Sequence, residues 1–186
     1  MIKNIAVKGL SVFFIAAVLM TCVSSDAEAG NGFTLYGDIA RIAIPAAALA
    51  MTAAKGDKDG AIQFGEALVT TAAVTYGLQY TVNAEGPDGE EHSFPSGHTS
   101  IAFAGAAFIQ QRYGWTYGAP AYLAAALVGV SRITGHKHHV ADVLAGAGIG
   151  IGANLIFTKK YEKNAVTLTP MPLDSGAGIM LGYSFP

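Results

Sequence analysis

Cysteine is almost absent from this sequence of 186 residues, and charged residues are scarce. Cys22 is the single thiol, and it lies in an amino-terminal segment that we expect to be removed. Disulfide bonds and thiolate metal sites are therefore excluded for the mature chain. Charged residues make up 13% of the sequence, the net charge is -2, and no basic patch is interleaved with aromatics, so we expect no nucleic-acid partner.

The first residues have the pattern of a secretory signal peptide. Lys3 and Lys8 precede the apolar run 10–23, and the small residues that follow suit cleavage by signal peptidase. We therefore expect residues 1–29 to be a signal peptide and the mature chain to be exported. A lipoprotein signal that ends at Cys22 is the alternative, which the bulky threonine before that cysteine disfavours.

Apolar residues dominate the rest of the chain. They make up 52% of the sequence, and the mean hydropathy of +0.40 is high for a soluble domain. Five apolar stretches approach the ~20 residues that a helix needs to cross a bilayer. They are residues 33–54, 61–82, 96–111, 119–132 and 139–157. The pattern predicts an all-α fold: a membrane-embedded bundle of about five core helices that forms one domain over residues 30–160.

Glycines and a few charges interrupt these apolar stretches. Asp38 and Arg41 lie one turn apart and are expected to pair, whereas Glu66 has no assigned partner. These charges are the best argument for the alternative of a soluble periplasmic bundle. In the last predicted helix, small residues at every second position allow close contact between helix backbones. They are Gly146, Gly148, Gly150 and Gly152.

The character of the sequence changes after residue 160. Alternating apolar and polar residues, with aromatics near the end, suggest short strands in the segment 161–186. We expect this C-terminal tail to be strand-like, and we assign it no part in catalysis.

The stretch 93–100 is typical of an anion site at a helix start. Ser96 is a favourable N-cap before an apolar run. Gly97 has no Cβ, so a ligand can closely approach the free N–H groups of the first turn. His98 has the near-neutral titration that suits proton donation to a leaving oxygen. Taken alone, this short pattern is more often a capped helix with a solvent-facing histidine.

A second stretch, residues 131–142, offers a guanidinium and an oriented histidine. The planar guanidinium of Arg132 can donate two parallel hydrogen bonds to phosphate oxygens, which the ammonium group of a lysine does less well. His138 and Asp142 are four positions apart and share a helix face, so the carboxylate can take the Nδ1 proton and leave Nε2 as a nucleophile. The alternatives are an ordinary polar loop and a zinc site built from the histidines of this tract. We assign no metal, because no further carboxylate or cysteine stands at a suitable spacing.

Together, the two stretches resemble the second and third motifs of the type 2 phosphatidic acid phosphatase family. That family shares its phosphate site with vanadium haloperoxidases and bacterial class A acid phosphatases. The resemblance covers residues 79–157, and two motifs in the correct order are far more specific than either alone. It implies a helical phosphatase that works without a cofactor.

The resemblance also implies a role for each site residue. His138 would attack phosphorus to give a phosphohistidine, Asp142 would fix the tautomer of that histidine, and His98 would protonate the departing alcohol. The residues implied to hold the phosphoryl oxygens are Arg132, Ser96 and Gly97.

The family's first motif is degenerate in this chain. It is a lysine followed, seven positions on, by an arginine and a proline, and here Gln79 and Gly86 stand in place of the two cations while Pro87 is retained. An arginine that stabilises transition-state charge contributes ~10³ to 10⁵ in rate, so turnover depends on other residues restoring this charge. The candidates for that role are Lys137, His92, His136 and His139.

Passing the five helices through a membrane, with the processed amino terminus outside, predicts the side on which the motifs lie. Ser96 and His138 both come to the outer face, together with the acidic loop 85–91. Basic residues fall on the inner side, as the positive-inside bias requires. They are Lys55, Lys58, Arg112, Lys159, Lys160 and Lys163.

We therefore predict a phosphatase of the bacterial cytoplasmic membrane whose site faces the periplasm. Its expected substrate is a phosphomonoester or diphosphate of a lipid, such as a phosphatidate, a polyprenyl carrier or a lipid A phosphate. We expect no metal, no cofactor and no protein partner. The alternatives are a soluble periplasmic acid phosphatase of broad specificity, a vanadate-dependent haloperoxidase, which the small exported chain disfavours, and a protein that binds phosphorylated lipid without hydrolysing it.

Overall fold

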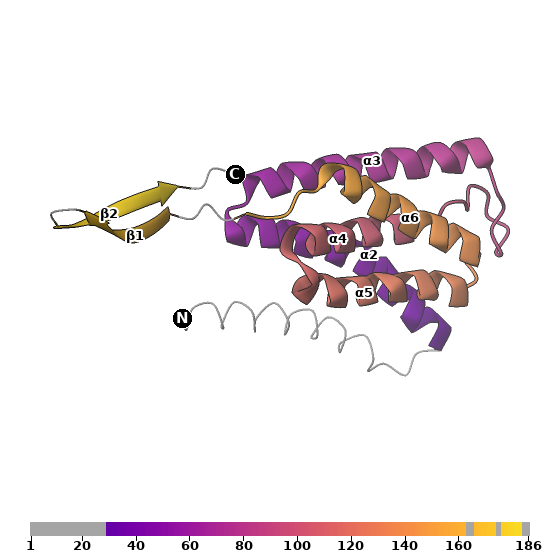
Figure 1. Cartoon of the computed structure of the whole chain (residues 1–186). Helices are drawn as coiled ribbons and strands as arrows, with labels where there is room; N and C mark the ends of the chain where they lie inside the picture. Colours follow the sequence, from indigo (N-terminus) through magenta and orange to yellow (C-terminus); the bar gives the residue numbers. More distant parts are fainter. Residues whose placement is uncertain (1–28, 163–165, 174–175, 184–186) are drawn as a thin grey trace.

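A computed structural model describes residues 29–162, 166–173 and 176–183, which form five helices and a two-stranded hairpin (Figure 1). The elements are α2 (Ala29–Lys55), α3 (Lys58–Val82), α4 (Gly97–Tyr113), α5 (Trp115–Thr134), α6 (Val140–Phe157), β1 (Val166–Leu173) and β2 (Gly176–Tyr183). The prediction of an all-α fold with five core helices is confirmed. The predicted signal peptide lies outside the described residues, apart from Ala29, where α2 begins.

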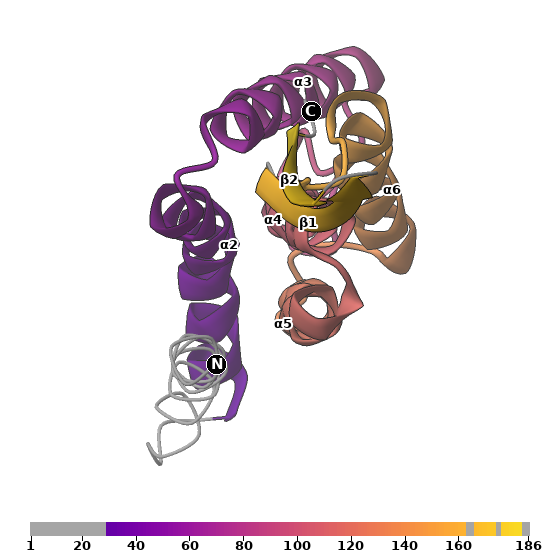
Figure 2. The same cartoon turned by 60° about the vertical axis from the view of Figure 1, so that its left-hand side comes forward.

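Helix α4 lies in the middle of the bundle, with α2, α3, α5 and α6 around it (Figure 2). Because neighbours enclose it, the middle of α4 is apolar on all sides, and its central residues Ala102, Ala106 and Phe108 are fully buried. Gly105 allows α2 to come close, since a Cβ there would lie 2.9 Å from the backbone nitrogen of Pro45. The central helix is thus positioned by its small residues, and its first turn is held at one end of the bundle.

Only two of the four glycines in α6 serve the close packing that the sequence predicts. A Cβ on Gly146 would clash with the backbone carbonyl of Ser96, and a Cβ on Gly150 would clash with that of Ser100. Gly148 has nothing within 4 Å of the position its Cβ would take, and the same holds for the fourth glycine, at position 152. The glycines that face α4 therefore let the start of α6 lie directly against the start of α4.

The end of the bundle at which α2 and α4 finish is held by a buried ion pair. Arg112 Nε donates to Asp57 Oδ2 at 2.8 Å, and the same carboxylate accepts from the Tyr113 hydroxyl at 2.8 Å and from the Gly60 N–H at 2.9 Å. Burial favours a higher pKa for Asp57, but its hydrogen bonds with Arg112, Gly60 and Tyr113 outweigh burial and hold the pKa below the ordinary value. We call this region the Arg112 end.

Much of the outer surface of the bundle is apolar. Among the described residues, α2 over Gly32–Lys55 and α6 over Val140–Phe157 are the two helices long and apolar enough to cross a membrane. Large apolar side chains point outward from several helices and remain exposed. They include Leu35, Ile39 and Ile42 of α2, Ile62 and Val69 of α3, and Leu144, Leu155 and Ile156 of α6. Such an apolar surface is compatible with contact to lipid. That the whole bundle is embedded in a membrane stays a prediction.

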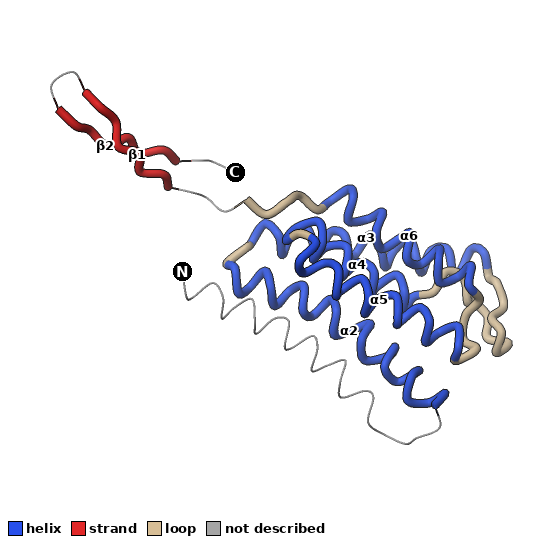
Figure 3. The backbone as a smooth tube through the Cα atoms, turned by 60° about the horizontal axis from the view of Figure 1, so that its bottom comes forward, coloured by secondary structure: helices blue, strands red, loops and turns tan. Residues whose placement is uncertain are grey.

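The C-terminal tail forms the strands that its alternating pattern predicts. β1 and β2 are antiparallel, with Val166 opposite Tyr183 and Leu173 opposite Gly176. Figure 3 shows this hairpin extending beyond the helices, and among the described elements the two strands pair only with each other. The hairpin lies beyond the Arg112 end, away from the loops that carry the motifs.

Candidate functional site

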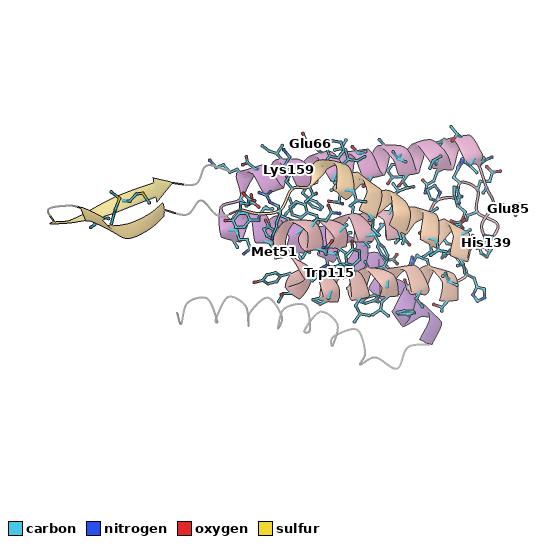
Figure 4. All side chains as sticks on the ribbon, in the orientation of Figure 1. Met51, Glu66, Glu85, Trp115, His139 and Lys159 are labelled. Atoms are coloured by element: carbon cyan, nitrogen blue, oxygen red, sulfur yellow. The ribbon has the colours of Figure 1, made fainter. Side chains whose placement is uncertain are left out.

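The predicted phosphate-site residues lie at the end of the bundle opposite the Arg112 end. Helices α4 and α6 begin there, and α3 and α5 finish there, so that the loops 83–96 and 135–139 lie together. Figure 4 shows Glu85 and His139 at this end and Lys159 at the other. We call it the histidine end. The alternating direction of the helices brings both motifs to it, although they are far apart in sequence.

Asp38 of α2 joins two of the predicted residues. His98 Nε2 lies 2.8 Å from Asp38 Oδ1, and Arg132 Nη1 donates to the same oxygen at 2.9 Å. Arg132 also donates to the backbone carbonyl of Thr34 and, at 3.2 Å, to the Ser131 hydroxyl. The Arg132 side chain is 4% exposed, whereas that of Asp38 is 46% exposed. Helix α2 therefore supplies a carboxylate that holds the candidate proton donor beside the candidate phosphate-binding arginine.

Ser93 lies between His138 and Asp142. Its Oγ is 3.0 Å from His138 Nδ1 and donates to Asp142 Oδ2 at 3.1 Å, whereas Nδ1 and Oδ2 are 3.7 Å apart. Because the serine proton goes to the carboxylate, the serine oxygen is left to accept a proton from Nδ1. The tautomer that satisfies both bonds carries its proton on Nδ1 and leaves Nε2 with a free lone pair. The contact expected from the spacing of His138 and Asp142 is therefore relayed through a hydroxyl.

Backbone hydrogen bonds connect these two groups of side chains. The N–H of Ser96 donates to the carbonyl of Asp142 at 3.0 Å, and the N–H of His138 donates to the carbonyl of Arg132 at 3.3 Å. A continuous path of contacts thus runs from His98 through Asp38, Arg132, His138, Ser93 and Asp142 to Ser96 and Gly97. All six residues predicted from the sequence belong to this path.

Ser96 is the N-cap of α4 by position, but its side chain does not cap the helix. Its hydroxyl accepts a hydrogen bond from Thr99 Oγ1 at 3.1 Å, and the residue is fully buried. The first N–H groups of α4 are therefore left without a side-chain cap. The role of Ser96 and Gly97 in holding phosphate stays a prediction.

Gln79, which replaces the lysine of the first family motif, lies close to the start of α4. Its Nε2 donates to the carbonyl of Pro95 at 2.9 Å, and a Cβ on Gly97 would lie 3.6 Å from the same nitrogen. The side chain thus reaches the site but brings a neutral amide, which donates one of its two hydrogens to a backbone carbonyl. The side chain supports the loop before α4, keeps one amide hydrogen free of that bond and adds no positive charge.

The electrostatics of the site favour a neutral His138. Burial lowers the pKa of this histidine, while the negative charge of Asp142 acts in the opposite direction. The imidazole is therefore unprotonated at pH 7, which is the form that can attack phosphorus.

His98 is the second residue of α4, outside the two helices that meet the length and hydropathy of a membrane span. Burial and the charges of Arg41 and Arg132 lower its pKa to about 4, against the opposing effect of Asp38. The ring is therefore neutral at pH 7. A phosphate dianion beside the ring would favour its protonated form, so that His98 would become a proton donor when substrate binds.

The cations proposed as replacements for the first motif have other partners. Lys137 Nζ lies 3.0 Å from Asp88 Oδ2, on the outer side of the loops. His92 Nδ1 is 3.0 Å from a backbone carbonyl of α3, and His139 Nδ1 is 3.6 Å from the carboxylate that Ser93 contacts. His136 sits in the 135–139 loop with a φ of 54°. None of these contacts directs a positive charge toward His98 and His138.

The zinc alternative finds no support in the geometry. Within residues 29–162, 166–173 and 176–183, no group of three or more histidine, cysteine, aspartate or glutamate side chains is arranged to hold a metal ion.

Three residues at the histidine end were not assigned from the sequence: Asp38, Ser93 and Arg41. Ser93 is the first residue of the stretch 93–100 and carries no signal of its own, because serines are common in loops. Asp38 was expected to pair with Arg41 but instead contacts His98 and Arg132. Charged side chains in an apolar helix cost free energy. Their presence in α2 was therefore the sequence signal that could have indicated a functional role for Asp38 and Arg41.

Comparison with known proteins agrees with this geometry. The family model of the PAP2 superfamily matches residues 61–165. The lipid A 4'-phosphatase of Helicobacter pylori is 29% identical over 146 residues, which cover 72% of this chain and 73% of that protein. The lipid A 1-phosphatase of Porphyromonas gingivalis is 34% identical over 135 residues, 66% of this chain but only 30% of that protein.

A plant protein shares a shorter region. The lipid phosphate phosphatase 1 of Arabidopsis thaliana is 42% identical over 73 residues, 31% of this chain and 22% of that protein. This chain thus spans most of the first relative but less than a third of the other two. No solved structure matches the chain.

Proposed function

The chain belongs to the PAP2 superfamily, and we propose that it is a lipid phosphatase that works through a phosphohistidine on His138. The single observation that carries the proposal is the contact path at the histidine end, in which Ser93 links His138 to Asp142 while Asp38 links His98 to Arg132. The path gives one histidine the orientation of a nucleophile and sets a second histidine beside an arginine.

The first chemical step is attack by His138 on the phosphoryl group. The Nε2 lone pair forms a bond to phosphorus as the bond from phosphorus to the lipid oxygen breaks. The positive charge that develops on the imidazole is stabilised by Nδ1–H donation to Ser93, whose hydroxyl is polarised by Asp142. His98 gives its proton to the departing oxygen, so the lipid leaves as a neutral alcohol.

The second step is hydrolysis of the phosphohistidine. Water attacks phosphorus, the neutral His98 takes the proton of that water, and the bond between phosphorus and His138 breaks to release inorganic phosphate. Arg132 and the free N–H groups at the start of α4 stabilise charge on the phosphoryl oxygens in both steps. The guanidinium already points into the site through its bond to Asp38.

We propose a membrane lipid as substrate, with the site on the periplasmic side of the cytoplasmic membrane. Two observations support this choice. Exposed apolar side chains cover α2 and α6, and both helices have the length and hydropathy of membrane spans. The two bacterial relatives are named as lipid A phosphatases, which favours an acylated sugar phosphate among the lipid candidates.

A phosphate-release assay on the purified full-length protein in detergent tests the proposal. The substrates are bis-phosphorylated lipid A, phosphatidate, a polyprenyl diphosphate and the soluble ester para-nitrophenyl phosphate, with His138→Ala as the control. We expect the wild type to release phosphate from at least one lipid at ~10³ times the rate of the control or faster. A marked preference for the soluble ester would instead indicate a broad acid phosphatase.

One observation favours a second candidate, a protein that binds phosphorylated lipid without hydrolysing it. Gln79 and Gly86 stand where the family's first motif has cations, and the neutral amide of Gln79 donates to the carbonyl of Pro95. Equal background release from the wild type and from His138→Ala, together with retained binding of the lipid, would establish this alternative.

A further inference from the structure

The histidine end lacks positive charge for a phosphate dianion if only the family motifs are counted. Arg132 is the one motif cation, and its Nη1 is paired with Asp38. Asp142 adds a second negative charge, and His98 and His138 are neutral at pH 7. Without another cation the site would carry a net negative charge and would repel its substrate.

Arg41 of α2 has an unexplained position next to this site. Among the described residues, one buried side-chain nitrogen or oxygen atom has no hydrogen-bond partner, and that atom is Arg41 Nε. Arg41 lies one turn from Asp38, on the same face of α2, and its charge is near enough to His98 to lower the pKa of that ring. The guanidinium therefore lies beside His98 with hydrogen-bonding capacity to spare.

The two other arginines of the described residues differ from Arg41 in this respect. Arg112 and Arg132 each have a carboxylate partner, and Lys137 has Asp88. Placing a guanidinium in an apolar helix without a partner costs stability, so packing gives no reason for an arginine at position 41. A buried polar group left unpaired in an otherwise satisfied site is expected where a ligand completes the bonding.

We propose that Arg41 contacts the phosphoryl group of the substrate and supplies the positive charge that Gln79 and Gly86 do not. This inference rests on the proposed function and extends its phosphate site to α2. The ligand class is a phosphate monoester dianion, whose oxygens accept from Arg41 on one side and from Arg132 on the other. The Asp38 carboxylate, which now occupies the space between His98 and Arg132, gives way to the phosphate.

Binding of inorganic phosphate to the full-length His138→Ala protein in detergent, measured by isothermal titration calorimetry, tests the proposal without turnover. Adding Arg41→Met should weaken phosphate binding at least ~10-fold, the usual cost of losing a hydrogen bond to a charged group. The melting temperature should stay the same or rise, because a buried Nε–H group without a partner is removed. Lys160→Met, at the Arg112 end, is the matched control and should leave affinity unchanged.

A second pair of variants keeps the test decisive if Arg41→Met does not fold. Arg41→Lys keeps the charge and Arg41→Gln removes it at similar size, so phosphate should bind more tightly to the lysine variant. Equal affinity in the two variants, or affinity of Arg41→Met within twofold of its parent, would overturn the proposal.

A double-mutant cycle with Asp38→Asn separates direct contact from an effect on Asp38. If Arg41 contacts phosphate, Arg41→Met weakens binding as much in the Asp38→Asn protein as in its parent. Disappearance of the effect would show that Arg41 acts only on Asp38, and would overturn the proposal. A wild type without phosphatase activity, but with phosphate affinity that depends on Arg41, would reject the proposed function and leave this inference standing.

Discussion

The two ends of the helical bundle each carry an arginine paired with an aspartate, and the two pairs are built differently. At the Arg112 end, both side chains are buried, at 7% and 3% exposure, and Asp57 accepts from a tyrosine and a backbone N–H as well. At the histidine end, Arg132 is equally buried, but Asp38 is 46% exposed and shares its oxygen with His98.

One pair is enclosed by internal partners, whereas the other has a carboxylate that is partly open to solvent. The Arg112 pair is saturated with internal partners and links the ends of α2, α4 and the segment after α6 through the carbonyl of Lys159. The Arg132 pair leaves a carboxylate that solvent or phosphate can reach. A polar cavity of about 890 Å³ lies at the Arg112 end, lined by residues of both charges and no histidine, so cavity size does not locate the chemistry.

The largest expected effect follows removal of the arginine at the histidine end. Arg132→Ala should lower the rate of phosphate release ~10³-fold, because the substrate loses its forked cation in the transition state. The exposed Asp38 can be solvated, so the melting temperature should fall less than in Arg112→Ala. Parallel assays of rate and thermal unfolding on both variants check this, and a larger rate loss in Arg112→Ala would reverse the assignment of the two ends.

The matching change at the Arg112 end should affect stability. Arg112→Ala leaves Asp57 as a buried carboxylate without its partner, which costs ~3–5 kcal/mol of unfolding free energy. Phosphate release per folded molecule should remain that of the wild type. Denaturant titration in detergent measures the free energy of unfolding, and the rate of phosphate release is divided by the concentration of folded protein. A variant as stable as the wild type would show that the ion pair does not stabilise the fold.

A smaller effect is expected where α6 meets α4. Gly150→Ala should destabilise the bundle by ~1–3 kcal/mol, because the new methyl group meets the backbone of α4 at Ser100. Gly152→Ala is the matched control, with open space at its Cβ, and should be neutral or slightly stabilising in a helix. Thermal unfolding compares the two, and equal melting temperatures would contradict the packing described for α6.

The smallest effect concerns the relay through Ser93. Ser93→Ala should lower kcat ~10-fold, since one hydrogen bond that orients His138 is lost while Asp142 remains 3.7 Å away.

The rate of the wild type should fall as the pH is lowered below the ordinary histidine range. Burial lowers the pKa of His138, and the imidazole loses its nucleophilic lone pair only when it is protonated.

The direction of the pH shift distinguishes this relay from a purely structural role. Donation from Nδ1–H to the Ser93 hydroxyl stabilises the protonated imidazole, so removal of that hydroxyl should lower the pKa of His138 and move the acid limb of the rate profile to lower pH. Since the folded-state pKa of His138 is depressed, its contribution to stability is complete above pH ~6.5 and is lost as the pH falls below that value. An unchanged acid limb in Ser93→Ala would contradict the relay.

Much of the fold was predictable because each helix is a long apolar stretch with a clear break. Gly114, with a φ of 89°, makes the sharp turn between α4 and α5 that the sequence placed near this point. The predicted helix 119–132 starts later than α5 itself, which begins at Trp115 and contains Pro120 in its first turns. Which glycines of α6 face α4 depends on helix rotation, which a uniform glycine pattern does not specify.

The motif residues at the site were predictable, but their partners were not. His98, Arg132 and His138 lie in short patterns with a recognisable chemistry. Ser93 and Asp38 act through contacts across 49 and 60 positions in sequence, which depend on how the loops and α2 pack against α4 and α6. Local spacing predicted a direct contact of Asp142 with His138 and a pair of Asp38 with Arg41, and packing replaced both with longer-range partners.

The most direct test of the central claim is to trap the phosphoenzyme. Rapid acid-free quenching of the wild type with a ³²P-labelled lipid substrate, followed by peptide mapping, should show a label that is stable in base, labile in acid and located on His138. The same label should be absent from His138→Ala. A phosphate-releasing wild type that carries no label, or carries it on another residue, would contradict the account.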